Sequence, residues 1–131
     1  MTTSPVILEQ VEAANRAFYD AFQNGDIGAM EACWRDGPGV SCVHPGGPII
    51  SGWPLVRASW EAILESEPEF VMDIEVVDVT VEDPVAWVTC LERMSRLGHA
   101  GRAGAQVVAT NMFVLDATGW RLSVHHASPV M

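Results

Sequence analysis

The side chains of this chain best suited to moving protons near neutral pH are two histidines and one glutamate. His44 follows the apolar run 40–43, Glu92 lies in the apolar segment 85–97, and His126 comes near the C-terminus. Imidazole titrates close to neutral pH, and burial raises the pKa of a carboxyl group towards the same range. These residue types therefore predict general acid–base catalysis by His126, His44 or Glu92.

The adjacent histidines, His125 and His126, do not predict a metal site. Neighbouring side chains of a strand point to opposite faces of the sheet, so this pair cannot bind one ion together. The cysteines are odd in number, have no metal-like spacing and lie among apolar neighbours, which is typical of buried reduced thiols. They are Cys33, Cys42 and Cys90. We predict no metal and no cofactor, and we find no nucleophile–base pair or nucleotide-binding motif.

A small apolar molecule is the partner that the aromatic residues around His44 predict. The turn 44–48 contains two prolines and two glycines, so a strand must stop there and the chain must turn back. Trp53 and Trp60, on the helix that follows, would then face His44, and with Trp34 they would contact the body of a ligand. The alternative is that the tryptophans fill the core and the histidine is a hydrogen-bonded core residue.

Three helices are expected to precede the long strands. Apolar residues spaced three and four apart predict a first helix from Val6 to Gln23, capped by Ser4 and ended by Gly25. Asp26 would cap a second, from residue 27 to about residue 34. Ser51 would cap a third that runs to about residue 65.

Four strands with period-two alternation follow the predicted helices. In the segment 70–82 the apolar set changes phase after Val76, which indicates a β-bulge and a strongly curved sheet. Further strands are expected at 85–97, 105–115 and 120–127, with a mobile loop at 98–104. A short strand at 40–43 comes before the third helix. The order predicts an α+β fold, with three N-terminal helices packed on a strongly curved antiparallel sheet.

The last hairpin predicts which side chains face the helices. If Leu115 pairs with Trp120 across the turn 116–119, strict alternation places Asn111 and His126 on the core face. The expected pairs are Phe113 with Leu122, Asn111 with Val124, and Ala109 with His126. The opposite face would carry Ser123 and His125 among other residues.

Glu92 is a conditional member of the same site. A register with Cys90 opposite Phe113 places Glu92 opposite Asn111 and on the core face, and a slip of one residue reverses this assignment. If buried, Glu92 would have a raised pKa and could act as a general base. Otherwise it would pair with Arg96 at a wet sheet end.

Composition and net charge limit the kinds of molecule that this chain can bind. The 131 residues predict one domain, 1–131, with 49% apolar and 18% charged residues. A formal net charge of −10 repels nucleic acid and anionic membranes, and the apolar runs are too short to span a bilayer. The N-terminus lacks the pattern of a secretory signal, so we expect a cytoplasmic protein.

Several stretches resemble SnoaL-like proteins of the nuclear transport factor 2-like superfamily. They are ANRAFYDAFQNGDIGAMEACW, VSCVHPGG, GWPLVRASWEAIL and TNMFVLDATGWRLSVHHASPVM. The resemblance implies a cone-shaped α+β barrel around a deep pocket, and a homodimer through the outer sheet face. It also implies site residues within the matched motifs, which are His44, Trp53, Trp60, Asn111, His126 and Ser128. The acid–base aspartate of the family's polyketide cyclases and steroid isomerases is not matched here.

The sequence predicts two alternative functions. The first is a small-molecule enzyme or binding protein with a closed, largely apolar pocket and isomerase-, cyclase- or dehydratase-like proton transfer. The second is a non-catalytic dimeric module that binds a ligand or a protein. The apolar face with Trp87, Leu91, Met112 and Val114 supports it, because such a face needs covering.

Overall fold

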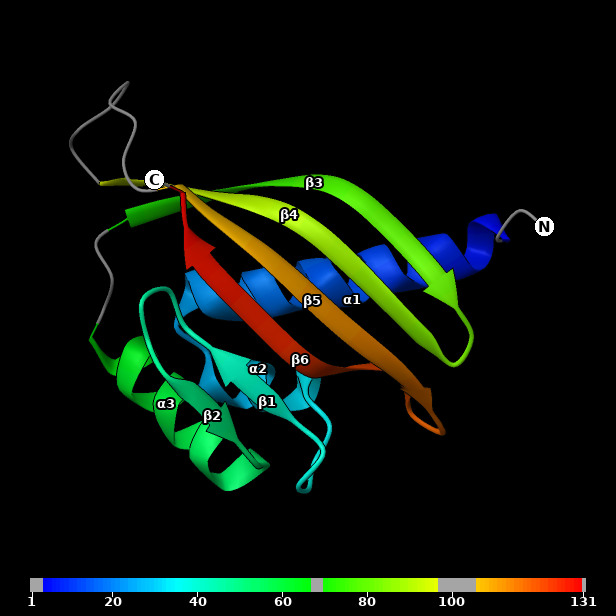
Figure 1. Ribbon diagram of the computed structural model, residues 1–131, viewed down its shortest axis with the longest axis horizontal. Coiled ribbons are helices and arrows are strands. Elements are labelled where there is room, and N and C mark those ends of the chain that lie inside the picture. Colours follow the sequence, from blue (N-terminus) through cyan, green and yellow to red (C-terminus); the bar gives the residue numbers. More distant parts are fainter. Residues whose placement is uncertain (1–3, 67–69, 97–105, 131) are drawn as a thin grey trace.

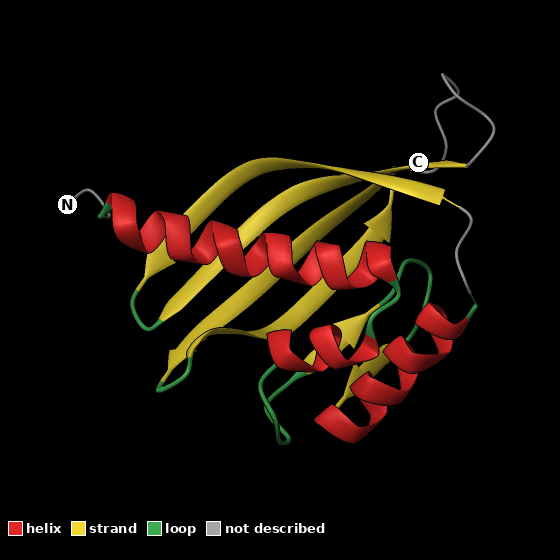
Figure 2. Cartoon of the chain, turned by 180° about the vertical axis from the view of Figure 1, so that it is seen from behind, coloured by secondary structure: helices red, strands yellow, loops and turns green. Residues whose placement is uncertain are grey.

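Three helices cover one face of a curved sheet in the computed structural model (Figure 1). The structure describes residues 4–66, 70–96 and 106–130. Within these ranges the helices are α1 (Pro5–Asn24), α2 (Ile27–Cys33) and α3 (Trp53–Glu65). Figure 2 shows all of them on the same side of the strands, so the predicted α+β architecture is confirmed. The loop predicted at 98–104 lies outside the described residues.

The first two helices begin and end where local side chains allow. Ser4 Oγ accepts a hydrogen bond from the backbone N–H of Val6 at 3.2 Å, and Asp26 Oδ1 accepts one from Ala29 at 3.0 Å. Gly25 ends α1 with a φ of 64°, a conformation that costs a residue without a side chain little. The two caps predicted from the sequence are thus confirmed.

The cap predicted for the third helix is wrong. Ser51 belongs to a short strand, β2 (Ile49–Ser51), which pairs antiparallel with β1 (Ser41–Val43). The turn 44–48 brings these residues back alongside β1, and pairing with an existing strand satisfies their backbone groups. Gly52, with a φ of 86°, precedes α3 and makes no side-chain cap.

The sheet order places β1, from the first half of the chain, beside β6, the last strand. Over the described residues the sheet has six strands in the order β2-β1-β6-β5-β4-β3. The long strands are β3 (Phe70–Glu82), β4 (Val85–Arg96), β5 (Gln106–Asp116) and β6 (Gly119–Pro129). The pairing of β1 with β6 is parallel and sets Cys42 beside His125. The remaining neighbours pair antiparallel.

The bulge predicted in the first long strand is confirmed. The register of β3 against β4 shifts between Val76 and Asp78, so Val77 has no partner and its side chain is 61% exposed. The long strands bend visibly around α1 in Figure 1. This curvature turns one sheet face into a concave surface for the helices.

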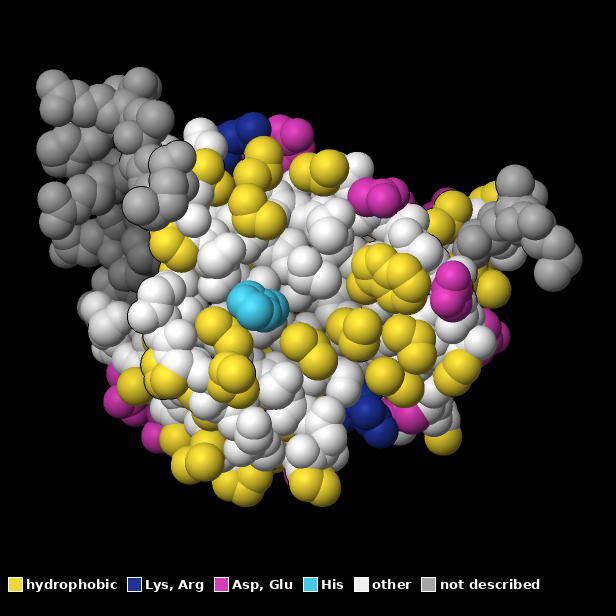
Figure 3. Space-filling model, viewed as in Figure 1, with side chains coloured by type: hydrophobic (Ala, Val, Ile, Leu, Met, Phe, Trp, Pro, Cys, Tyr) yellow, Lys and Arg dark blue, Asp and Glu magenta, His cyan; other side chains and the backbone are white. Residues whose placement is uncertain are grey.

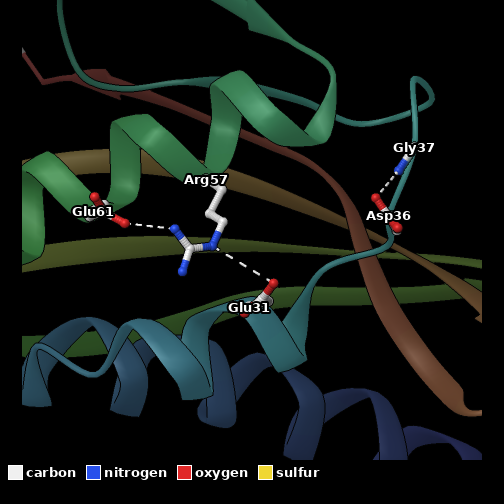
Figure 4. A network of polar contacts seen from close by, with 5 residues as sticks. All are labelled: Glu31, Asp36, Gly37, Arg57 and Glu61. Carbon is white, nitrogen blue, oxygen red and sulfur yellow. Dashed lines mark hydrogen bonds and ion pairs between the residues drawn. The ribbon is translucent and has the colours of Figure 1, made fainter.

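The core fills the space between that concave face and the helices. Its largest members come from all layers: Phe18 of α1, Trp60 of α3 and Phe113 of β5 are each 0% exposed. Exposed ion pairs of Arg57 add one contact within α3 and one between α3 and α2. Arg57 of α3 lies 2.6 Å from Glu61 and 3.7 Å from Glu31 of α2 (Figure 4). Such exposed pairs stabilise a fold by only about 0–1 kcal/mol. No helix among the described residues is long and apolar enough to cross a membrane.

Candidate functional site

A second bulge, in β6, decides which histidine faces the interior. The predicted pairs Leu115–Trp120 and Phe113–Leu122 are confirmed, but the register then shifts and Ser123 is left without a partner. Beyond it Asn111 pairs with His125, and Thr110 with His126. His125 is therefore on the core face, 1% exposed, whereas His126 is exposed. The predicted placement of His126 on the core face is wrong.

The bulge has a local cause at Ser123. This side chain is buried, and its hydroxyl donates to the carbonyl oxygen of Gly39 at 3.0 Å. Arg35 Nη1 donates to the same hydroxyl at 3.3 Å, and the backbone N–H of Arg35 donates to the oxygen of Leu122 at 2.9 Å. The segment that leaves α2 thus holds Ser123 inward, and one residue of β6 is taken out of the alternation.

His126 and Ser128 both lie away from the interior. His126 pairs with Thr110 on the outer face and is exposed, and Ser128 is exposed as well. The pocket roles predicted for these two residues have no support from their placement.

Glu92 is on the core face, although its predicted register is wrong. Cys90 pairs with Ala109 instead of Phe113, and Glu92 pairs with Val107 instead of Asn111. The slip is four residues along β5, and an even slip keeps every side chain on its face. The Glu92 side chain is 1% exposed.

A chain of hydrogen bonds links Glu92 to His125 across the concave face. Tyr19 OH donates to Glu92 Oε2 at 2.6 Å. Asn111 Nδ2 donates to Tyr19 OH at 3.0 Å and to Asn15 Oδ1 at 2.9 Å. His125 Nδ1 lies 2.5 Å from Asn111 Oδ1. All five side chains are at most 6% exposed, and we call them the polar cluster.

Three members of the polar cluster were missed from the sequence. Asn15 and Tyr19 are four residues apart in α1, on the same buried face as Val11 and Phe18. A polar residue at a position of the apolar stripe is the signal that could have identified them. His125 was missed because the Ser123 bulge decides which sheet face its side chain lies on.

His44 and Trp60 lie beside His125, as aromatic neighbours. The ring centroid of Trp60 lies 4.8 Å from that of His44 and 5.7 Å from that of His125. The centroids of the two histidine rings are 6.5 Å apart. His44 is half-buried, and its Nε2 lies 3.0 Å from Ser59 Oγ. The structure thus brings together the predicted residues His44, Trp60, Glu92 and Asn111.

Trp34 and Trp53 form a separate pair. Their ring centroids are 6.0 Å apart, and both line a surface cavity of about 330 Å³ together with Arg35 and Arg121. Two further surface cavities, of about 570 and 370 Å³, are lined by described residues. Members of the polar cluster line none of these three, so the closed apolar pocket stays a prediction.

Burial sets the charge states in the cluster. Burial, together with the smaller effects of the nearby His44 and His126, lowers the pKa of His125 to about 3. Burial also lowers the pKa of His44, and it raises that of Glu92 against the opposing effect of the Tyr19 hydrogen bond. The His125 imidazole is consequently neutral at pH 7.

The cysteines near the cluster are weak nucleophiles. Burial raises the pKa of the Cys42 thiol to about 12 and that of Cys90 to about 11, so both stay protonated at neutral pH. Among the residues that the structure describes, no three His, Cys, Asp or Glu side chains are grouped so that they could hold a metal ion.

Comparisons with known proteins identify the family and show a shared fold. The family model described as "SnoaL-like domain" matches residues 11–131. A solved candidate dehydratase of the NTF2-like family from Streptomyces avermitilis is 35% identical, with a TM-score of 0.84 over 98% of this chain and 99% of that one. A candidate calcium/calmodulin-dependent protein kinase type II association domain from Thiobacillus denitrificans is 29% identical, with a TM-score of 0.85 over 92% and 94%.

A curated relative matches this chain over part of its own length. The F-box protein SKIP8 of Arabidopsis thaliana is 27% identical over 119 residues, which are 91% of this chain and 48% of the relative. The chain therefore spans about half the length of that relative.

Proposed function

Because this chain belongs to the SnoaL-like domain family, we propose that its polar cluster transfers protons on a small neutral molecule, with His125 as the general base. This assignment moves the role that the sequence suggested for His126 to its neighbour. The chemistry we propose is of the isomerase or dehydratase kind, in which a base removes a proton from carbon. The name of the Streptomyces avermitilis relative, a candidate dehydratase, supports the second of these.

One observation carries the proposal: a ring nitrogen of His125 without a hydrogen bond lies close to a buried hydrogen-bond donor, the indole N–H of Trp60. The Nε2 atom of His125 makes no hydrogen bond to any residue in the described ranges. Within the same part of the chain, the buried side-chain nitrogens without a hydrogen-bond partner of good geometry are Nε1 of Trp60 and of Trp120, and the Trp60 N–H also lies near enough to the Cys42 thiol to lower its pKa. The ring centroids of His125 and Trp60 are 5.7 Å apart. An unpaired buried donor costs about 1–3 kcal/mol, so the Trp60 N–H beside the open nitrogen of His125 favours a functional explanation.

The roles of the surrounding residues follow from their contacts. His125 would take the proton at Nε2, with Asn111, Tyr19 and Glu92 holding the ring from the other side. Trp60 would donate its N–H to an oxygen of the substrate, and Phe18, whose ring centroid lies 4.9 Å from that of His125, would contact its apolar part. His44 would exchange protons with solvent, because it is half-buried beside both rings.

A neutral substrate fits the charges of the molecule. Among the described residues the buried polar and charged side chains are Asn15, Glu92, Asn111, Ser123 and His125, with no arginine. The whole chain carries a net charge of −10. A phosphate or carboxylate would find no buried cation to replace its lost hydration.

The test compares two neighbouring histidines. We would screen small neutral cyclic ketones and alcohols by ligand-observed NMR against the wild type, His125→Ala and His126→Ala. We expect compounds that bind the wild type and His126→Ala but not His125→Ala. Hits that bind all three proteins alike would contradict the proposal. Near-ultraviolet circular dichroism controls for the fold of each variant.

A non-catalytic dimer is the second function that an observation favours. Val108, near the start of β5, is 44% exposed on the outer sheet face, and Figure 3 shows several apolar side chains on the side of the molecule that it views. We propose that a second copy of the chain covers this face, including the half-buried Trp87, Leu91, Met112 and Val114. A dimer would be compatible with either function, and a dimer without any small-molecule hit would favour the second.

We also propose the cytoplasm as the location of this protein. Its cysteines 33, 42 and 90 are free thiols, which suits a reducing compartment. Fractionation of cells that express the full chain would test this, and recovery in a secreted or membrane fraction would contradict it.

A further inference from the structure

We propose that Asn15 and Tyr19, acting through Asn111, fix the proton of His125 on Nδ1 and so keep Nε2 free as the basic nitrogen. The catalytic meaning of this inference rests on the proposed function, but the protonation site can be measured without any substrate. Asn15 and Tyr19 would be positioning residues, because neither touches the reacting nitrogen.

A neutral imidazole exists in two forms that differ in which ring nitrogen carries the proton. Either ring nitrogen can carry the single proton, and only the other one can act as a base. The bonded partner of one nitrogen decides which form is present. In His125 that partner is the side-chain oxygen of Asn111, 2.5 Å from Nδ1.

The orientation of the Asn111 amide is set by two acceptors on α1. Asn111 Nδ2 donates to Asn15 Oδ1 at 2.9 Å and to Tyr19 OH at 3.0 Å. An amide oxygen can only accept. The Tyr19 hydroxyl directs its one proton to Glu92 Oε2 at 2.6 Å, so towards Asn111 it also accepts. Both acceptors require the NH₂ end of Asn111, and the oxygen is left for His125.

The protonation site of His125 follows from that orientation. Asn111 Oδ1 cannot donate, so a close contact with Nδ1 is favourable only if Nδ1 carries the proton. The alternatives each place two acceptors against each other. A proton on Nε2 would set the Nδ1 lone pair against Asn111 Oδ1, and a flipped amide would set Oδ1 against Asn15 and Tyr19.

Burial strengthens the preference for a proton on His125 Nδ1. Asn111 is 0% exposed, His125 1% and Asn15 2%, so bulk water does not compete for these bonds. In such surroundings an unsatisfied pair of acceptors costs much more than at a surface. An amide side chain does not pass protons along, so the cluster orients His125 and does not relay charge to Glu92.

The experiment reads the two ring nitrogens directly. Long-range ¹H–¹⁵N correlation spectra of ¹⁵N-labelled protein at pH 7 distinguish a protonated ring nitrogen from an unprotonated one. For wild-type His125 we expect a protonated Nδ1 and an unprotonated Nε2. In the double variant Asn15→Leu/Tyr19→Phe, which lacks both acceptors, we expect a mixture of the two forms.

Cys90→Ala is the matched control. The Cys90 sulfur lies 3.2 Å from Tyr19 OH and 3.8 Å from Asn111 Nδ2, so it touches the same atoms without fixing the amide. We expect the wild-type protonation pattern in this variant.

Two results would overturn the inference: wild-type His125 protonated on Nε2, or an unchanged pattern in the folded double variant. If the double variant does not fold, the wild-type spectrum alone decides. A protonated Nδ1 together with a His125→Ala variant that binds ligands normally would overturn the proposed function and leave this inference standing.

Discussion

At the residue scale, the burial of His125 among aromatic rings removes the water that would stabilise a charged imidazolium. Phe18 and Trp60 lie against the ring with centroid distances of 4.9 and 5.7 Å. Asn111 supplies one hydrogen bond to Nδ1. His125 is thereby held neutral, and a neutral imidazole is the form that can accept a proton.

The lowered pKa predicts that His125 destabilises the fold in acid. The pKa is about 3 in the folded protein against an ordinary value of 6.5, so the unfolded chain binds the proton first. This contribution to stability is complete above pH 6.5 and is lost as the pH falls towards 3. Between pH 8 and pH 5 we expect a loss of about 2 kcal/mol from this residue.

Urea unfolding of the wild type and His125→Gln at pH 8 and pH 5 checks this prediction. The wild type should lose more stability than the variant between the two pH values. Equal losses would show that His125 is protonated in the folded protein as easily as in the unfolded one.

The raised pKa of Glu92 predicts that its contribution to the stability of the fold has the opposite dependence on pH. Burial raises its pKa above the ordinary value of 4.5, so its stabilising effect is present below pH 4.5 and is lost as the pH rises through the folded value. Glu92→Gln keeps an oxygen that can accept from Tyr19 but carries no charge. We expect this variant to unfold at a higher urea concentration than the wild type at pH 8, and the difference to vanish near pH 4. A less stable variant at pH 8 would contradict the prediction.

At the element scale, the β6 bulge is the feature that assembles the site. The bulge sets His125 opposite Asn111, and α1 brings Asn15 and Tyr19 down onto the same face. A strand without the bulge would have turned His126 inward, as regular alternation predicts.

Ser123→Ala tests the bonds that hold the bulge. The variant leaves the Gly39 carbonyl without the Ser123 hydroxyl, now 3.0 Å away, and we expect a loss of about 1–2 kcal/mol. Ser128→Ala, an exposed serine of the same strand, is the control and should change stability by less than about 0.5 kcal/mol. Urea midpoints measure both, and equal effects would contradict the role given to Ser123.

The two bulges also show what sequence patterns can and cannot predict. The β3 bulge is visible because it moves a run of valines from one face to the other. The β6 bulge is invisible, because Ser123 is neither clearly apolar nor charged and its partners, Gly39 and Arg35, lie far away in the sequence. The helices and the core face of Glu92 could likewise be predicted from local periodicity. The hydrogen bonds among α1, β4, β5 and β6 could not, because they depend on tertiary packing.

At the scale of the whole molecule, the outer sheet face is the surface that we propose a second copy of the chain covers. Val108 lies there between Leu91 of β4 and Ser128 of β6, and it is 44% exposed. A lysine at this position would place a charge in the proposed dimer interface.

Light scattering of two variants tests the dimer. We expect Val108→Lys to be monomeric at micromolar concentration, where the wild type is dimeric. Leu55→Lys is the control, since Leu55 is 64% exposed on α3 and away from the sheet face. A monomeric wild type, or an unaffected Val108→Lys variant, would contradict an interface on this face.

His125 Nε2 is the atom that we propose meets a ligand. The most direct measurement is the ¹⁵N resonance of this nitrogen during titration with the neutral cyclic ketones and alcohols of the screen. We predict that binding compounds shift His125 Nε2 and leave the ring nitrogens of exposed His126 unchanged. Compounds that bind the protein but leave His125 Nε2 unshifted would contradict the account.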